Sequence, residues 1–218
     1  MSSARSKMLG RIRLATATQV ADAAYIAAEA AALLPDPTAT RPAFEEFSIR
    51  EKFVERATSE RLTATVDEID DWSAATDTVH NYLKKNNIPL RIALQPKELL
   101  ANLNWADVEH HEQIAPNELA AVGVADYGIA ETGTLVFTSK PDSPTLFNFL
   151  GLHHIVLVES KNLLRYMEDY WKIVRENGNV QPRNINFVTG TSGTADIEAK
   201  NTRGAHGPRF LHIIIVGQ

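Results

Sequence analysis

Residues Leu62–Leu94 read LTATVDEIDDWSAATDTVHNYLKKNNIPLRIAL, and this stretch decides the fold class. Its first apolar residues, at positions 62, 64 and 66, alternate with threonines, which is the period of a β-strand. Apolar residues then recur at helical spacing over Ala75–Leu83, behind Ser73 as an N-cap, and Ile88–Leu94 predicts a second strand. Strands that alternate with helices of this length predict an α/β fold, a mainly parallel sheet with helices on both faces.

The same alternation continues outward in both directions. An apolar pattern predicts a helix over residues 47–57, and Asn162–Glu176 predicts the clearest helix, with Gly178 as its C-terminal cap. The apolar stripe of that helix consists of Leu163, Met167, Tyr170, Trp171 and Val174. Short apolar runs predict five more strands at Val122–Val124, Thr134–Phe137, Ile155–Val158, Ile185–Val188 and Leu211–Val216.

The first 44 residues differ in character from the rest. Residues 1–32 are rich in alanine and predict a helix or a pair of helices that ends before Pro35. Leu34–Pro42 then holds three prolines in nine residues, which is typical of a linker or an extended arm. We therefore expect an N-terminal helical segment with a proline-rich linker over residues 1–44 and an α/β domain over residues 45–218.

The composition excludes several classes of function. The 218 residues include no cysteine, which excludes thiol catalysis, disulfides and cysteine-ligated metal or iron–sulfur sites within this chain. The net charge of −5 argues against nucleic-acid binding, because such proteins usually carry a basic surface for phosphates. No run of 18 apolar residues and no secretory signal is visible, so we expect no membrane span and a cytoplasmic location.

The first segment that can carry chemistry is Gly190–Thr194, which follows a predicted strand. Small residues let an anion approach backbone N–H groups, and hydroxyls add donors, especially if Ala195–Lys200 begins a helix. An ordinary turn, with Asp196 capping the helix, is an equally good interpretation. The candidate ligand-binding residues of this segment are Gly190, Thr191, Ser192, Gly193, Thr194 and Asp196.

The second segment, Asp126–Thr134, lies directly before a predicted strand. A carboxylate such as Glu131 in a turn of small residues can act as a nucleophile or general base if burial or its neighbours tune it. The alternative is a hairpin turn in which Gly133 supplies a positive φ and Glu131 is solvated. The candidate ligand-binding residues here are Thr132, Gly133 and Thr134.

Histidines supply the third candidate group. His206 stands between two glycines in Arg203–Arg209, where it is accessible and can titrate near neutral pH, although a lone histidine in a turn is more often structural. The adjacent pairs His110-His111 and His153-His154 make poor chelates because neighbouring residues of a strand point to opposite faces. The sequence therefore predicts no metal site and no cofactor held by this chain.

Four motifs together resemble the LUD (lactate utilisation) domain family and, within it, the lactate utilisation protein C type. They are Ile129-Ala-Glu-Thr-Gly-Thr-Leu135, Asn186-Phe-Val-Thr-Gly-Thr-Ser192, Thr194-Ala-Asp-Ile-Glu198 and Gly204-Ala-His-Gly-Pro208. The resemblance covers roughly residues 45–218. The chain departs from the family's usual pattern at Thr191, in place of a proline, and at Gly193, in place of an arginine or asparagine.

This resemblance implies a sugar-isomerase and CoA-transferase-like α/β fold. It also implies a component of a cytoplasmic three-protein system that oxidises L-lactate to pyruvate, with iron–sulfur proteins as partners. A small anionic metabolite would then bind in a Gly/Thr-rich cleft, with Glu131 and His206 as the catalytic candidates. Two alternatives stay open, a stand-alone acyl- or CoA-transferase-like enzyme with Glu131 as its nucleophile, and a structural subunit with a vestigial cleft.

The arrangement of the motifs gives a specific expectation about the fold. Gly190–Asp196 and Asp126–Thr134 both adjoin apolar strand runs. Ligands of open α/β sheets bind outside the carboxyl ends of the strands. We therefore expect the two segments side by side at the carboxyl ends of neighbouring strands.

Overall fold

The computed structural model describes residues 4–16, 22–32, 41–44, 46–178, 180–195 and 201–217. It divides into two compact units, Met1–Ala43 and Phe44–Gln218. The first unit contains helices α1 (Ala4–Ala15) and α2 (Ala23–Ala32), neither of which has a buried residue. The sequence predicts one alanine-rich helix or a pair of helices here, and the structure has the pair. Most of the proline-rich segment that follows lies outside the described residues.

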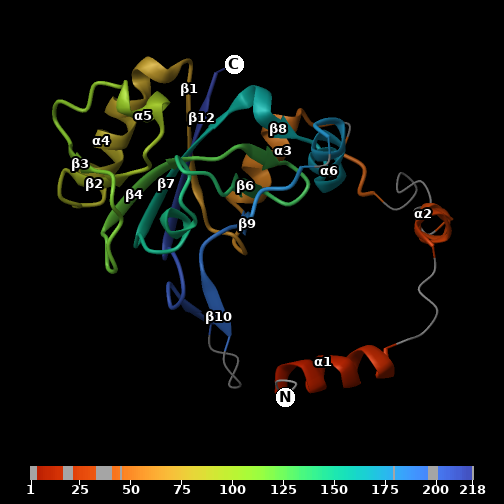
Figure 1. The fold of residues 1–218 in the computed structure, drawn as a ribbon. Coiled ribbons are helices and arrows are strands. Elements are labelled where there is room, and N and C mark those ends of the chain that lie inside the picture. The colour runs from red at the N-terminus through yellow and green to blue at the C-terminus, as the bar shows by residue number, and fades with distance from the viewer. Residues whose placement is uncertain are drawn as a thin grey trace. The chain divides into compact units, whose positions relative to one another are not determined.

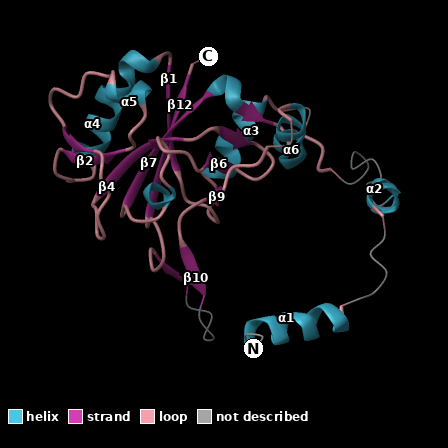
Figure 2. Ribbon diagram, viewed as in Figure 1, coloured by secondary structure: helices cyan, strands magenta, loops and turns pink. Residues whose placement is uncertain are grey.

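The second unit is built on a six-stranded sheet, and every neighbouring pair in it is parallel. Figures 1 and 2 show its strands fanning through the middle of this unit. The strand order is β1 (Thr65–Ile69), β12 (Phe210–Val216), β7 (His153–Glu159), β4 (Ala120–Val124), β2 (Arg91–Leu94) and β3 (Glu109–His111). The central strands are buried on both faces, as their continuous apolar sequences require. The predicted α/β class with a mainly parallel sheet is confirmed.

Helices cover one face of this large sheet. They are α4 (Ala75–Lys85), which follows the 3-10 turn η2 (Trp72–Ala74), and the short α5 (Glu98–Ala101). Side chains of β7 alternate between the two faces. Ile155 and Leu157 pack with α4, whereas Val156 and Val158 pack on the other side.

The opposite face is covered by α3 (Ile49–Ala57) and by a second sheet, which the sequence did not predict. Its order is β8 (Leu163–Leu164), β5 (Tyr127–Ile129), β6 (Thr134–Thr138) and β9 (Ile185–Thr189). Helix α6 (Met167–Glu176) packs on the outer side of this small sheet through Tyr170 and Val174. The other elements of the described residues are η3 (Thr145–Asn148), η4 (Ser160–Asn162) and a two-stranded hairpin, β10 (Gly193–Ala195) with β11 (Asn201–Arg203).

Two elements do not begin where the sequence predicts, and both positions lie before α4 in the sequence. Strand β1 begins at Thr65, three residues after Leu62, because Thr63 has a φ of +57° that breaks the extended run. Ser73 is not the N-cap of the following helix. The Asp71 carboxylate instead accepts a hydrogen bond of 2.7 Å from the Ser73 N–H at the start of η2.

Two predicted helices also differ from the structure. The helix predicted from Asn162 begins at Met167, because Leu163 and the residue after it form β8 beside β5. Leu163 therefore belongs to the core between the sheets and not to a helical stripe. The helix predicted from Ala195 is absent at that residue, which lies in β10, and the rest of that segment lies outside the described residues.

Candidate functional site

Polar residues gather at both edges of the large parallel sheet. We call the first group the amino-edge cluster. It consists of residues 62–64 before β1, residues 203–209 before β12, and the segment Gly190–Thr194 that packs against them. The second group lies where β2, β4 and β7 end, and we call it the carboxyl-edge cleft.

Two predicted motifs meet in the amino-edge cluster. The Ser192 N–H donates to the Pro208 carbonyl at 2.9 Å, and the Gly204 N–H donates to the Ser192 carbonyl at 3.0 Å. A Cβ placed on Gly207 would lie 3.2 Å from the Cβ of Ser192, so these two segments of the chain touch there. The N–H of Thr191 also donates to the Leu62 carbonyl, at 3.1 Å. The N–H groups of Thr191 and Ser192 are therefore engaged within the protein, and the predicted N–H cradle for an anion cannot use them.

The predicted segment Asp126–Thr134 reaches the same region through hydroxyl groups. The Thr134 hydroxyl lies 2.7 Å from that of Thr132 and 2.7 Å from that of Thr189, the residue before Gly190. The expected adjacency is therefore present at Thr134. The expected position at the carboxyl ends of neighbouring strands is wrong, because Thr134 starts β6 whereas Thr189 ends the antiparallel β9.

The turn that holds Glu131 joins β5 to β6, as the hairpin alternative predicts. Gly133 has a φ of +66°, and a Cβ there would lie 2.8 Å from the Ala57 nitrogen. The same alternative expects a solvated Glu131, and this part of it is wrong. Glu131 is half-buried, and its carboxylate accepts a hydrogen bond of 3.4 Å from the Met167 N–H at the start of α6. The side chain therefore already has a structural contact.

The remaining predicted residues are placed less favourably. His206 is exposed in the loop before β12, Gly193 is exposed in β10, and Thr194 pairs with Thr202 across the β10–β11 hairpin. Asp196 lies outside the described residues. The histidine pair at the start of β7 divides as expected, since His153 packs on Tyr82 and His154 on Phe137, on opposite faces of the sheet.

Arg203 is a functional candidate that the sequence analysis missed. Its guanidinium donates hydrogen bonds to the hydroxyls of Thr63 and Thr191 and a longer one, of 3.4 Å, to a backbone carbonyl. Within the described parts of the chain, no carboxylate lies at ion-pair distance from it. Its direct partner across the hairpin is Gly193. The signal was available, because Arg203 opens the segment that was singled out only for its histidine.

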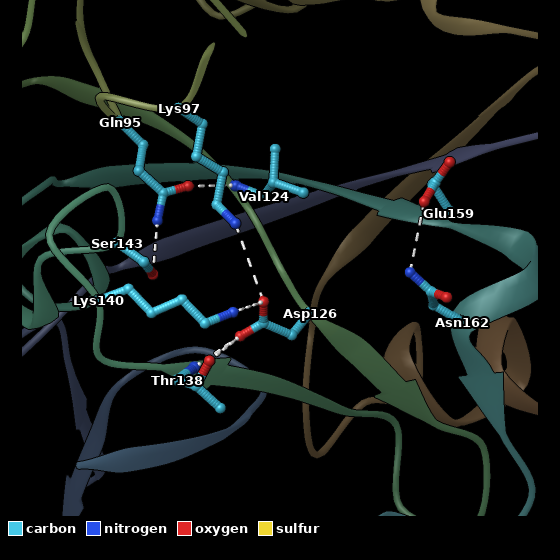
Figure 3. A network of polar contacts seen from close by, with 9 residues as sticks. All are labelled: Gln95, Lys97, Val124, Asp126, Thr138, Lys140, Ser143, Glu159 and Asn162. Carbon is cyan, nitrogen blue, oxygen red and sulfur yellow. Dashed lines mark hydrogen bonds and ion pairs between the residues drawn. The ribbon is translucent and has the colours of Figure 1, made fainter. Parts of the chain in front are cut away.

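The carboxyl-edge cleft contains a cavity of about 690 Å³. It lies between the ends of β2, β4, β6 and β7 and helix α6 with the residues that follow it. Figure 3 shows its polar floor, where Lys97 and Lys140 both point to Asp126. The distances from the two ammonium nitrogens to the nearer Asp126 oxygen are 3.8 Å and 3.1 Å.

Asp126 is held by the end of β6. Its other oxygen accepts hydrogen bonds from the Thr138 N–H at 2.7 Å and from the Thr138 hydroxyl at 2.6 Å. Burial by itself would raise the pKa of Asp126, but the hydrogen bonds from Thr138 and the charge of Lys140 outweigh it and lower the pKa below its usual value. The cleft therefore contains a carboxylate that stays ionised.

A buried glutamine fixes the loops beside this floor. The Gln95 side-chain oxygen accepts a hydrogen bond of 2.7 Å from the Val124 N–H, and its nitrogen donates to the Ser143 hydroxyl at 2.9 Å (Figure 3). No motif in the sequence points to Gln95, Lys97 or Lys140, because each is a single residue that follows a strand. Only Asp126 fell within a predicted segment.

Known proteins resemble this chain in sequence. The profile of the LUD domain matches residues 50–216. The protein named Lactate utilization protein C from Bacillus pumilus (strain SAFR-032) is 30% identical over 161 residues, which are 71% of this chain and 67% of that protein. Its namesake in Halalkalibacterium halodurans is 27% identical over 172 residues, covering 74% of this chain and 72% of that protein. The protein of the same name from Bacillus subtilis (strain 168) is 32% identical over 126 residues, which are 56% of this chain and 52% of that protein.

A solved structure supports the fold. The crystal structure of a DUF162 family protein from Deinococcus radiodurans matches this chain with a TM-score of 0.58 and 19% sequence identity, over 81% of this chain and 100% of that one. None of the helices in the described residues is both long and apolar enough to cross a bilayer.

Proposed function

The chain belongs to the LUD domain family, and on that premise we propose that it is a component of a lactate utilisation system that binds a small carboxylate at the amino-edge cluster. The names of the relatives supply the metabolic context, although they are matched over 52% to 72% of their own length. The observation that carries the binding site is Arg203, a half-buried guanidinium with neutral partners among the described residues.

The chemistry of Arg203 fits a carboxylate. A guanidinium is planar and always charged, and it pairs with both oxygens of a carboxylate. The hydroxyls of Thr63 and Thr191 orient the group without neutralising its charge. Gly193, directly opposite on the hairpin, has no side chain to compete for this space. Arg203 would thus supply the charged donor that position 193 lacks.

The other candidate residues have supporting roles in this proposal. Ser192 and His206 would donate to the ligand from two loops, which touch where Gly207 packs against Ser192. Glu131 would keep the turn before β6 docked on α6 through the Met167 N–H. The rest of the proposed site consists of Thr132, Gly133, Thr134, Gly190, Thr194 and Asp196.

Oxidation of lactate to pyruvate removes two electrons, which need an acceptor. Because this chain has no cysteine, cysteine-ligated iron–sulfur clusters would have to belong to partner proteins. We therefore propose that this chain provides the carboxylate site and that its partners provide the electron transfer.

The binding site can be tested by thermal unfolding in the presence of L-lactate and pyruvate. A ligand at a hundredfold excess over its Kd should stabilise the folded chain by about 2.7 kcal/mol. Arg203→Gln should weaken binding about tenfold or more, because it removes a charge-assisted contact. Arg183→Gln is the matched control, since Arg183 is an exposed arginine outside the cluster. Equal binding by both variants would contradict a carboxylate site at Arg203.

The metabolic context is tested with the same variants. In the organism that encodes this chain, deletion of its gene should prevent growth on L-lactate while leaving growth on glucose intact. A plasmid copy of the wild type or of Arg183→Gln should restore growth, and Arg203→Gln should not. Unimpaired growth of the deletion strain on lactate would contradict the proposed role.

A further inference from the structure

The carboxyl-edge cleft is not used by the proposed carboxylate site, which lies at the other edge of the sheet. Its cavity of about 690 Å³ falls within the range of small-molecule sites, roughly 300–1,000 Å³. It also lies outside the carboxyl ends of parallel strands, where open α/β sheets bind their ligands. Both its size and its position are therefore those of a binding site.

The floor of the cleft has more positive than negative charge. The carboxylate of Asp126 faces two ammonium groups, those of Lys97 and Lys140 (Figure 3). Each ammonium has three N–H donors and contacts the same Asp126 oxygen, so donors remain on both. Among the described residues, Asp126 is therefore the one carboxylate at ion-pair distance from the two ammonium groups.

Lys97 is the less satisfied of the two lysines. Its side chain is only 14% exposed, yet its nearest carboxylate oxygen is 3.8 Å away, beyond hydrogen-bond distance. No hydrogen bond from its ammonium to another described residue is present. A partly buried ammonium is costly to leave without a close partner. The position of Lys97 is therefore what is expected if a bound anion completes its contacts.

Three more carboxylates line the cleft, those of Glu98, Asp142 and Glu159. Glu159 already pairs with Lys161 at 3.0 Å, and Glu98 is exposed to solvent. Among the described residues, none of the three lies at ion-pair distance from Lys97 or Lys140. Exposed charges are screened over a length of about 8 Å at physiological salt, whereas the floor is partly buried. The exposed charges of the rim therefore mainly affect how a ligand approaches, whereas the charges of the floor affect how tightly it binds.

The upper wall of the cleft is apolar. Val180 is 79% exposed and Leu99 is 42% exposed, and both line the cavity together with Ile173 of α6. Exposed apolar side chains around a charged floor provide contact for the carbon body of a ligand. Lactate is too small to reach both the wall and the floor of a cavity of this size.

We propose that the carboxyl-edge cleft is a second binding site, for an amphipathic anion. Its carboxylate or phosphate group binds between Lys97 and Lys140, and its apolar body lies against Leu99, Ile173 and Val180. The two head groups share this chemistry, and the experiment distinguishes them. The site goes beyond the proposed lactate role and does not depend on Arg203.

The test uses the fluorescent aromatic sulfonate ANS as a probe, bound to the folded full-length chain and displaced by octanoate or by phenyl phosphate. Lys140→Gln and Lys97→Gln should each weaken ANS binding about tenfold, since each removes a charge-assisted contact. Val180→Ser should also weaken it, and because Val180 is exposed this variant keeps the fold. Lys172→Gln, an exposed lysine of α6 outside the cleft, is the matched control and should bind as the wild type does.

The outcomes separate the two sites and the two head groups. Displacement by octanoate alone assigns a carboxylate ligand, and displacement by phenyl phosphate alone assigns a phosphate. Arg203→Gln should leave ANS binding unchanged, so a failure of the lactate site does not affect this result. If Lys140→Gln, Lys97→Gln and Val180→Ser all bind ANS as the control does, or if the wild type binds none of the probes at millimolar concentration, the proposal is overturned.

Discussion

The two edges of the parallel sheet use polar residues in different ways. At the amino edge, glycines let loops touch each other. A Cβ on Gly190 would lie 2.8 Å from the Leu62 backbone, and Gly207 stands against Ser192. At the carboxyl edge, no glycine is among the described residues that line the cavity, which has Asp126 and two lysines at its floor. A glycine-rich motif therefore predicts that another group approaches the backbone closely. That group can be a ligand or another loop of the same chain.

The largest expected effect tests this view of the glycines. Gly190→Val should destabilise the fold by roughly 4 kcal/mol, from strain at a φ of +79° and from overlap with Leu62. Gly178→Val is the matched control, since Gly178 has a φ of +80° but no heavy atom within 4 Å of the added Cβ. Chemical denaturation of both variants separates the two contributions, because the backbone strain is shared.

The comparison fails if the two glycine variants lose the same stability. Gly190 would then be needed only for its backbone conformation, and the packing of the amino-edge loops would not depend on its missing side chain. A larger loss in Gly190→Val supports loop contact as the purpose of the motif.

The sequence predicts the large sheet well because its strands are long and apolar. Val122, Ile155 and Ile213 are fully buried, and such positions allow few other residues. The small sheet could not be predicted, since β5 and β8 have three and two residues, and their pairing depends on contacts distant in sequence. For the same reason Leu163 appeared to continue a helix that begins only at Met167.

The candidate site can be predicted from the sequence only where its functional residues form a local motif. The Gly190 and His206 segments meet as their small residues suggest, but the charge among them comes from Arg203, whose reach across to Thr63 no local pattern reveals. The cleft is less predictable still. Lys97 and Lys140 are 43 positions apart, counted from their residue numbers, and the fold alone brings both to Asp126.

The edges should also respond differently to acid. His154, near the start of β7, is 1% exposed, and neither ring nitrogen has a hydrogen-bond partner among the described residues. Burial lowers the pKa of His154 from 6.5 to about 4. The unfolded chain therefore binds a proton between these values that the folded chain does not, and stability falls as the pH drops below 6.5.

This response gives the second prediction. Between pH 7.5 and pH 5 the wild type should lose about 2 kcal/mol more stability than His154→Leu, as the two pKa values require. At pH 7.5 the variant should be at least as stable, since leucine needs no hydrogen bond. Urea unfolding at both pH values measures the difference. Parallel pH profiles for the two proteins would mean that the imidazole does not stay neutral in the fold.

The smallest effect compares one hydroxyl at each edge. The Thr138 hydroxyl donates to the ionised Asp126 at 2.6 Å, whereas the Thr189 hydroxyl shares a neutral contact of 2.7 Å with Thr134. Hydrogen bonds to charged groups stabilise by about 1.5–3 kcal/mol and neutral ones by about 0.5–1.5 kcal/mol. Thr138→Val should therefore cost more than Thr189→Val, which serves as its matched control with the same change of atoms.

Acid should then distinguish the two valine variants further. Since the folded-state pKa of Asp126 lies below its unfolded value of 3.8, its contribution to stability is present above that pH and is lost as the pH falls through the folded pKa. Removing the Thr138 hydroxyl raises the pKa of Asp126, so the difference between Thr138→Val and the wild type should shrink toward pH 3. The difference for Thr189→Val should stay constant, because no charged group of the described residues accepts from Thr189. Equal costs at pH 7 with no convergence in acid would show that the carboxyl edge is held by ordinary neutral contacts, and the contrast between the edges would then rest on the cavity alone.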